Sequence, residues 1–351
     1  MAAGEESMRR SLVPRSLVRS PWSWVPGHKS PVRGPSSWVP RHRSRVGGRW
    51  SSVPCQRSVA SGPPPRVVGA VVGVAVLLCA TAIWASATQG PKRIISLIPA
   101  VTEMLFAIGA GPQVVGVSSF DDYPAEVRNL ERVGALLDPD LEKILALKPD
   151  LVVVYATQTD LRRQLERARV GTYSYQHAGL ADITTTIRDL GARTGHTEEA
   201  GGVATAIEQR MRDLRRRTVG RPRPRTLLVI GREPLATRGV FASGGVGFLH
   251  DVLTAAGGDN IFADVKRQSV QASSELILAR RPEVIIEVRA GEILEEHRRK
   301  EIESWQRLAA LPAVQSGRVY FITDPRTVVP GPRVAKGAEI IARALHPEAF
   351  R

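Results

Sequence analysis

The chain has 351 residues, of which 43% are hydrophobic, and its formal net charge at pH 7 is +15. This length supports two domains that each bury a core. Residues 1–66 hold 12 Lys and Arg against 2 acids, which leaves only +5 for the rest of the chain. The high pI therefore reflects the N-terminal segment, and the composition of the remainder excludes a strongly basic nucleic-acid-binding domain.

Residues 1–65 are rich in Pro, Ser, Gly and Arg and repeat Ser-Trp-Val-Pro at 23–26 and 37–40. No hydrophobic period in this segment would bury a core, so we predict disorder. Two interpretations stay open. The segment is either a basic arm that contacts anionic lipid or nucleic acid, or an extension produced by a start codon assigned too far upstream.

Residues 66–90 contain an uncharged apolar run, 67–87, which is long enough to span a bilayer. The run ends in Ala-Ser-Ala at 85–87, the small-x-small pattern of a signal-peptidase site. We expect either a cleaved signal peptide or a retained membrane anchor. Lipidation at Cys79 is disfavoured because large residues precede it at 76–78. Each of these fates places the following chain outside the cytoplasm.

The two cysteines, Cys55 and Cys79, both lie upstream of residue 88. A disulfide framework or a cysteine-based metal site is therefore excluded from residue 88 onward. An oxidising compartment would not harm this part of the chain.

From residue 92 onward, segments typical of strands and helices alternate, which predicts a parallel sheet with crossover helices. We assign 91–180 to an N-terminal lobe. Its expected strands are 93–98, 114–117, 151–155 and 172–175, and its expected helices are 101–108, 141–147 and 160–169.

A long helix over 197–217 forms the main part of a connecting region, 181–220, which also contains an expected helix at 183–193. Thr197 is the expected N-cap, and arginines at 215–217 suit the negative C-terminal end of the helix. At 1.5 Å per residue the helix is roughly 30 Å long, enough to cross a domain.

The C-terminal lobe, 221–351, repeats the order of the first. Residues 141–154 and 274–287 both carry a glutamate, a short amphipathic helix, a basic residue, a proline, an acid and an apolar strand. This self-similarity predicts two lobes of one design on either side of the long helix. Ligands of such sheets bind beyond the carboxyl ends of the strands, so two facing lobes would share a ligand cleft. The expected strands are 225–230, 284–288 and 318–322, and the expected helices are 248–256, 274–280, 292–308 and 334–345.

Residues 93–111, Arg-Ile-Ile-Ser-Leu-Ile-Pro-Ala-Val-Thr-Glu-Met-Leu-Phe-Ala-Ile-Gly-Ala-Gly, resemble the opening of the periplasmic binding proteins that serve cobalamin, haem and ferric-siderophore ABC importers. Asp-Asp-Tyr-Pro at 121–124, Gly-Gly-Asp-Asn-Ile-Phe at 257–262 and Ser-Ser-Glu at 273–275 follow in the family's order. The resemblance covers roughly 92–346 and is closest to the cobalamin-binding members. It implies an α/β fold of two Rossmann-like lobes joined by one rigid helix, in agreement with the arrangement predicted above.

In that family, one glutamate per lobe docks on arginines of the permease dimer, and by position the resemblance assigns this role to Glu142 and Glu275. The internal repeat superposes the same two glutamates. Two carboxylates on separate lobes can contact two basic sites on a symmetric partner at once. The helix dipole alone also favours a glutamate in a first turn, so each residue by itself is weak support.

Six residues that follow predicted strand ends are the candidate ligand contacts: Asp122, Tyr123, Tyr155, Arg232, Asp324 and Arg326. The resemblance places aromatic contacts to the corrin at Tyr123 and Tyr155. The charged residues of the C-terminal lobe either bind an acidic ligand or pair with each other. The tryptophans common among cobalamin binders are missing, since only Trp305 follows residue 87, and we expect it to pack within its own lobe.

We therefore expect a periplasmic or otherwise extracytoplasmic solute-binding protein, not an enzyme, that captures a corrinoid and presents it to an ABC importer. Haem or a ferric siderophore is the alternative ligand, and no cofactor, metal or nucleic acid is expected.

Alternatives from other classes are a membrane-anchored adaptor with a vestigial cleft and a nucleotide-using enzyme built on the glycine-rich segment 243–248. That segment lacks the Lys-Ser/Thr of a P-loop, which favours a tight turn. Of the scattered histidines, His177 follows a strand end, where it either lies on the surface or faces the cleft as a haem ligand.

Overall fold

The computed structural model describes residues 90–176 and 178–351, and the statements below concern this part of the chain. The predictions for 1–65, for the apolar run 67–87 and for His177 lie outside the described residues. Within the described ranges, the structure contains no helix that is both long and apolar enough to cross a membrane.

The N-terminal lobe is built on a five-stranded sheet with strand order β3-β2-β1-β4-β5. Every strand pair in it is parallel, as predicted. The central β1 and β4 are almost entirely buried, because helices cover a parallel sheet on both faces. The strands are β1 (Ile94–Ser96), β2 (Val114–Val117), β3 (Glu131–Arg132), β4 (Leu151–Tyr155) and β5 (Gly171–Tyr175), and the helices are α2 (Pro99–Ala107), α3 (Leu141–Ala146) and α4 (Thr159–Arg167).

The C-terminal lobe is built on a six-stranded sheet with strand order β11-β10-β6-β7-β9, and β8 pairs with β6 off this path. The expectation of a purely parallel sheet is wrong here, because β7 pairs antiparallel with both β6 and β9. The strands β7 and β9 have four residues each, too few to show a strand period in the sequence. The strands are β6 (Arg225–Gly231), β7 (Val240–Ser243), β8 (Asp259–Asn260), β9 (Ser269–Ala272), β10 (Val284–Val288) and β11 (Val319–Ile322), and the helices are α7 (Phe248–Ala255), α8 (Ser274–Arg280), α9 (Glu295–Glu303), α10 (Pro312–Gln315) and α11 (Val334–Leu345).

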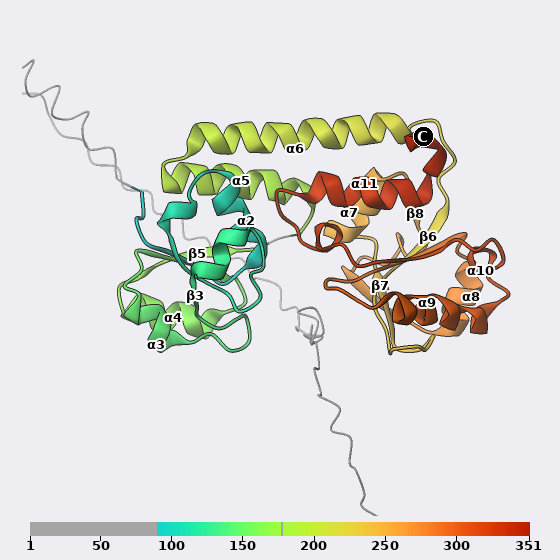
Figure 1. Cartoon of the computed structure of the whole chain (residues 1–351), viewed down its shortest axis with the longest axis horizontal. Helices are drawn as coiled ribbons and strands as arrows, with labels where there is room; N and C mark the ends of the chain where they lie inside the picture. The colour runs from blue at the N-terminus through green and yellow to red at the C-terminus, as the bar shows by residue number, and fades with distance from the viewer. Residues whose placement is uncertain (1–89, 177) are drawn as a thin grey trace, which may run out of the picture. The chain divides into compact units, whose positions relative to one another are not determined.

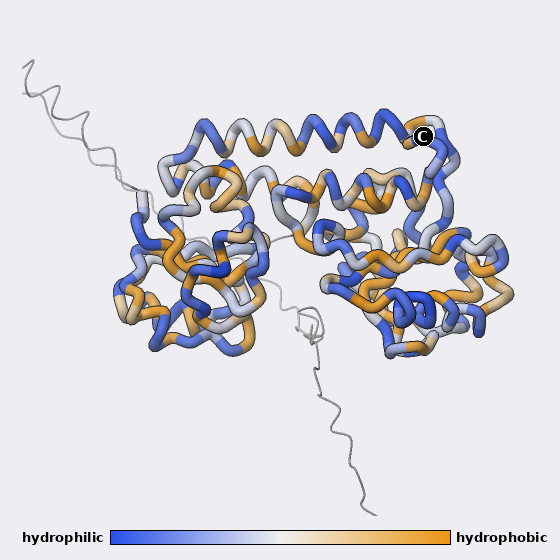
Figure 2. Tube along the Cα trace, viewed as in Figure 1, coloured by the Kyte–Doolittle hydropathy of each residue, from blue (hydrophilic) through white to orange (hydrophobic). Residues whose placement is uncertain are grey.

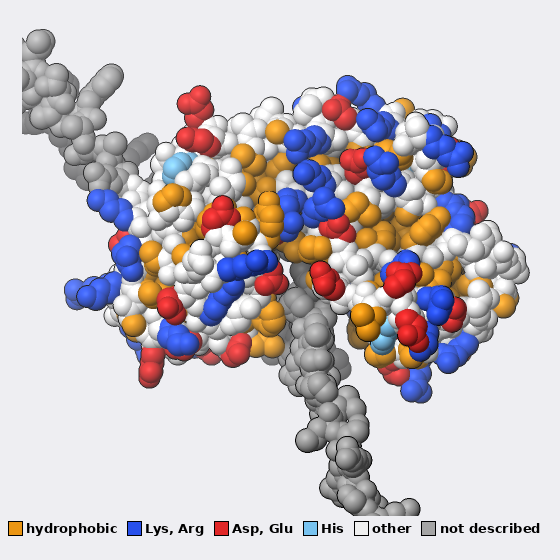
Figure 3. Space-filling model, viewed as in Figure 1, with side chains coloured by type: hydrophobic (Ala, Val, Ile, Leu, Met, Phe, Trp, Pro, Cys, Tyr) orange, Lys and Arg blue, Asp and Glu red, His pale blue; other side chains and the backbone are white. Residues whose placement is uncertain are grey.

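The predicted long helix is α6 (Thr197–Thr218), which packs against α5 (Leu180–Thr194) and α11 (Figure 1). The assignment of Thr197 as N-cap is wrong: His196 is the N-cap, and no side chain caps the helix. The arginines of the last turn are exposed, and Figure 3 shows Lys and Arg gathered over the C-terminal half of α6. Figure 2 shows the apolar side of α6 turned toward α5 and α11.

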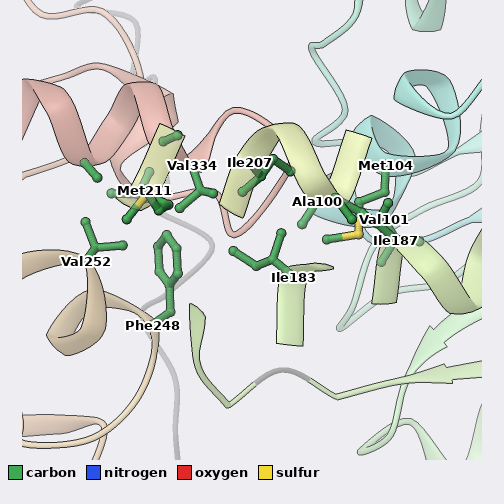
Figure 4. Close-up of a cluster of buried hydrophobic side chains, with 14 of the residues drawn as sticks. Ala100, Val101, Met104, Ile183, Ile187, Ile207, Met211, Phe248, Val252 and Val334 are labelled. Carbon is green, nitrogen blue, oxygen red and sulfur yellow. The ribbon is translucent and has the colours of Figure 1, made fainter. Parts of the chain in front are cut away.

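One hydrophobic cluster, the shared core, draws side chains from both lobes (Figure 4). Met104 of α2 and Ile187 of α5 belong to it, together with Ile207 and Met211 of α6 and Val252 of α7. Two smaller clusters each stay within one lobe. The lobes are therefore joined by a packed helical layer as well as by one continuous helix.

Candidate functional site

Tyr155 ends β4, at the carboxyl edge of the N-terminal sheet where the sequence predicted a ligand contact. Its ring meets that of Tyr175 edge-on, with the centroids 6.0 Å apart and the planes at 61°. Burial raises the pKa of Tyr155 to about 12, and the negative charge of Asp121 acts in the same direction. The phenol therefore stays protonated and keeps its hydrogen-bond donor at physiological pH.

Asp121 follows β2 at the same sheet edge and is completely buried. Its Oδ2 accepts a hydrogen bond of 2.8 Å from the backbone N–H of Ser118. The Nη1 group of Arg132 donates to the backbone carbonyls of Ser118 and Asp121 at 2.8 and 2.6 Å and so fixes this turn. The predicted contact Asp122 is exposed. Sequence reasoning chose the second aspartate of the Asp-Asp pair, while the buried acid is the first.

Burial raises the pKa of Asp121 to about 7. Hydrogen bonds from Thr102 and Ser118 and the charge of Arg132 oppose this shift, and the charge of Glu103 adds to it. The turn after β2 therefore holds an acid whose pKa lies well above the usual range of an aspartate.

Tyr123 lies against an arginine that the sequence analysis missed. The guanidinium carbon of Arg333, the residue just before α11, is 3.8 Å from the centroid of the Tyr123 ring. Arg333 Nε and Nη2 donate to the two carboxylate oxygens of Glu103 on α2 at 2.8 and 2.5 Å. Tyr123 and Glu103 belong to the N-terminal lobe and Arg333 to the C-terminal lobe. A signal was available, because Glu103 is the only charged residue of α2.

Asp324 and Arg326 pair with each other, which is one of the two arrangements that the sequence left open. Asp324 Oδ1 accepts from the backbone N–H of Arg326 at 2.9 Å and from its Nε at 2.8 Å. Arg326 therefore lowers the pKa of Asp324, and the charge of Arg333 acts in the same direction. The pair lies beyond the end of β11, close enough to Arg333 for this charge to act.

Arg232, unlike Asp324 and Arg326, lies in the interior of the C-terminal lobe. Its side chain is completely buried, with Nε 2.7 Å from Glu287 Oε2 and Nη2 2.8 Å from Glu301 Oε2. The guanidinium carbon also lies 5.1 Å from the ring centroid of Trp305, which packs inside the C-terminal lobe as expected. Two buried carboxylates of its own lobe take up Nε and Nη2 of Arg232, so this geometry gives no support to a ligand contact at Arg232.

The two predicted docking glutamates occupy equivalent positions. Glu142 is the second residue of α3 and Glu275 the second residue of α8, and both are exposed. The N-caps also correspond, since Asp140 and Ser273 each accept a hydrogen bond from the backbone N–H three residues later, at 3.0 and 3.2 Å. Ser273 also lowers the pKa of Glu275 through a hydrogen bond. The structural equivalence of the two glutamates is confirmed, and their docking role stays a prediction.

Backbone atoms from another part of the chain pack closely against the glycine-rich segment 243–248, which precedes α7. A Cβ on Gly244 would lie 2.0 Å from the carbonyl oxygen of Arg267, and one on Gly245 would lie 2.1 Å from that of Ala263. The amides of both glycines donate to backbone carbonyls, at 3.0 and 2.8 Å. These amides are therefore not free to cradle a phosphate, in agreement with the predicted tight turn.

Potential metal ligands are scattered in the part of the chain that the structure describes. No group of three or more His, Cys, Asp or Glu there lies close enough together to hold a metal ion. His250 and His346 face structural partners instead, with ring nitrogens 3.2 Å from the Asn260 side chain and from the carbonyl of Gly257, respectively.

Known proteins resemble this chain both in sequence and in fold. The vitamin B12-binding protein of Salmonella typhimurium is 34% identical over 272 residues, which cover 77% of this chain and 94% of that protein. The periplasmic vitamin B12-binding protein BtuF of Vibrio cholerae superposes with a TM-score of 0.63 and 28% identity, covering 75% of this chain and 99% of that one. The periplasmic heme-binding protein RhuT of Roseiflexus sp. RS-1 superposes with a TM-score of 0.62 and 25% identity, covering 74% and 100%.

The periplasmic binding protein family model matches residues 94–325. This match begins at β1 and ends just after β11, so it takes in both sheets and the connecting helix. With this match and the Salmonella relative, the chain belongs to the periplasmic binding protein family.

Proposed function

We propose that this protein is the extracytoplasmic solute-binding component of an ABC importer and that it captures cobalamin or a related corrinoid. One observation carries the choice of ligand: the 34% identity to a vitamin B12-binding protein extends over 94% of that protein's length. The protein has no catalytic step in this proposal. It binds its solute between the two lobes and presents it to a permease.

The side chains at the strand ends suit such a ligand. A corrinoid has a broad ring face and a rim of amide groups. Tyr123 is 47% exposed and offers an aromatic ring, and Tyr155 offers a protonated phenol. Arg333 and the Asp324–Arg326 pair provide donors and acceptors for the amide rim.

Delivery rests on Glu142 and Glu275, which we propose contact basic sites on a permease dimer, one from each lobe. Their exposure and their matching first-turn positions support this role. The apolar run 67–87 delivers the protein across the membrane as a signal peptide or holds it there as an anchor.

The ligand is tested by thermal unfolding of the purified protein with cyanocobalamin, hemin or a ferric siderophore. A ligand at 100 times its dissociation constant stabilises the native state by about 2.7 kcal/mol. We expect a rise in melting temperature with cyanocobalamin only. A rise with hemin or with the siderophore, and none with cyanocobalamin, would assign the other ligand class.

A further inference from the structure

The ion pair between Glu103 and Arg333 joins residues that are 230 positions apart in the chain. Glu103 lies on α2 of the N-terminal lobe, and Arg333 directly precedes α11 of the C-terminal lobe. Both carboxylate oxygens of Glu103 accept from the guanidinium, so the contact is bidentate. Bidentate pairs fix orientation as well as distance.

The pair is well shielded from water. The side chain of Glu103 is 5% exposed and that of Arg333 is 22% exposed. Burial raises the pKa of Glu103, while the hydrogen bond and charge of Arg333 oppose that rise. A buried carboxylate that loses its partner is strongly unfavourable, so the pair resists any motion of the lobes that separates these residues.

The backbone around this ion pair leaves little room for Glu103 and Arg333 to move. A Cβ on Gly331 would lie 3.2 Å from Glu103 Oε2 and 3.7 Å from the carbonyl oxygen of Ala100. The loop before α11 therefore lies directly against α2. Val334, the next residue after Arg333, packs into the shared core (Figure 4).

The same guanidinium stacks on Tyr123. The guanidinium carbon is 3.8 Å from the ring centroid, and Tyr123 as a residue is 47% exposed. The bonds to Glu103 use Nε and Nη2 of Arg333, so Nη1 takes no part in the ion pair. Tyr123 and Arg333 thus form one ring-and-guanidinium surface with free binding capacity, built from both lobes.

We infer that Glu103 is a positioning residue for ligand capture: it holds Arg333 against Tyr123 and so fixes the ring-and-guanidinium surface that the ligand meets. This inference rests on the proposed function. Glu103 itself is covered and acts through Arg333, while Arg333 and Tyr123 make the contact. Both members of the pair also act on charged neighbours, since Glu103 raises the pKa of Asp121 and Arg333 lowers the pKa of Asp324.

The first test measures cyanocobalamin binding to Glu103→Gln, which keeps the size of the side chain and removes its charge. We expect the dissociation constant to rise at least about tenfold. The matched control is Glu287→Gln, the same change at a buried glutamate whose two arginine partners, Arg232 and Arg289, lie in the same lobe. The control should melt at a lower temperature yet bind cyanocobalamin as the wild type does. Equal affinity in Glu103→Gln and wild type would overturn the inference.

A second test asks whether Glu103 acts through the ring-and-guanidinium surface. Tyr123→Leu removes the ring, and the double variant Glu103→Gln/Tyr123→Leu should bind more tightly than the product of the two single losses predicts. Strictly multiplicative losses would show that Glu103 acts elsewhere. If Glu103→Gln does not fold, Glu103→Asp replaces it, because the shorter side chain keeps the charge and leaves Arg333 intact but weakens the bidentate contact.

A third experiment measures the distance between the lobes without any ligand. Its result therefore does not depend on whether the proposed ligand is correct. Spin labels at Arg163 and Arg299, exposed by 69% and 68%, report the distance between the lobes once Cys55 and Cys79 are changed to Ser. We expect a narrow distance distribution in wild type and Glu287→Gln and a broader one in Glu103→Gln. A protein that binds no cyanocobalamin but shows this broadening would refute the proposed ligand and retain the interlobe contact. An unchanged distribution in Glu103→Gln would refute the contact's positioning role.

Discussion

Asp121 gives the protein a titration of its own near neutral pH. In the unfolded chain an aspartate ionises near 3.9, whereas burial in the native protein raises the pKa of Asp121 to about 7. Between these pH values the native state holds a proton that the unfolded state has lost. The free energy of unfolding should therefore fall as pH rises from about 4 to about 7, by about 4 kcal/mol in total, and then level off.

Asp121→Asn removes this titration and should flatten that decline, leaving the variant more stable than wild type at pH 8. Urea unfolding at a series of pH values measures the difference between the two proteins. Asp122→Asn, at the exposed neighbour, is the control and should follow the wild-type curve. Parallel curves for Asp121→Asn and wild type would contradict the prediction.

Sequence reasoning placed individual residues correctly where their position depends only on the local segment. The positions of Glu142 and Glu275 in their helices follow from the repeated segment around each. The Glu103–Arg333 contact depends on two segments 230 residues apart, and no local pattern indicates that they meet. Arg232 was misjudged for the same reason, because its second partner, Glu301, comes from α9, far along the chain.

At the scale of elements, the network of Arg232 with Glu287 and Glu301 joins β6, β10 and α9. Arg232→Met would leave two buried carboxylates without their shared partner. We expect the free energy of unfolding to fall by about 3–5 kcal/mol. Arg238→Met is the control, because Arg238 is 79% exposed in its pair with Glu233 and should change stability by no more than about 0.5 kcal/mol. Chemical denaturation measures the free energy of unfolding of both variants, and equal losses of this free energy would contradict the prediction.

The first turns of α3 and α8 carry the proposed docking residues. Glu142→Ala with Glu275→Ala should change the free energy of unfolding by no more than about 0.5 kcal/mol per site and leave cyanocobalamin affinity intact, because both side chains are exposed. Uptake through the cognate permease in proteoliposomes should be lost, since truncating one member of a buried interfacial charge pair costs about 2–5 kcal/mol. Glu198→Ala with Glu199→Ala, at exposed first-turn glutamates of α6, should leave uptake unchanged. Normal uptake by the first double variant would show that docking uses other residues.

Most helices and the long parallel strands followed from hydrophobic period and turn residues. The antiparallel β7 and β9 did not, because four residues are too few to show a period of two. Their pairing depends on register with β6, which forms only in the folded lobe. The N-terminal start of α6 was also placed with the wrong cap, because the helix begins without any side-chain cap.

At the scale of the molecule, three contacts besides α6 tie the lobes together. The shared core takes side chains from both lobes, Asp251 Oδ2 accepts from the backbone N–H of Leu180 at 2.9 Å, and Glu103 binds Arg333. Rotation of one lobe must disturb packed side chains as well as bend a helix. We expect ligand binding to rotate the lobes by about ten degrees or less. Small-angle scattering of free and loaded protein checks this, and a wide rotation would contradict it.

The shared core also has a consequence for how the chain folds. Val334, Ala338 and Ile341 of α11, near the end of the sequence, pack in the same cluster as Met104 of α2, near the start of the described chain. Neither lobe can complete its interior before the last helix has left the machinery that makes or exports it. Any export route that threads an unfolded chain therefore releases a protein that gains its packed interior, and with it the contact between Glu103 and Arg333, only in its final step.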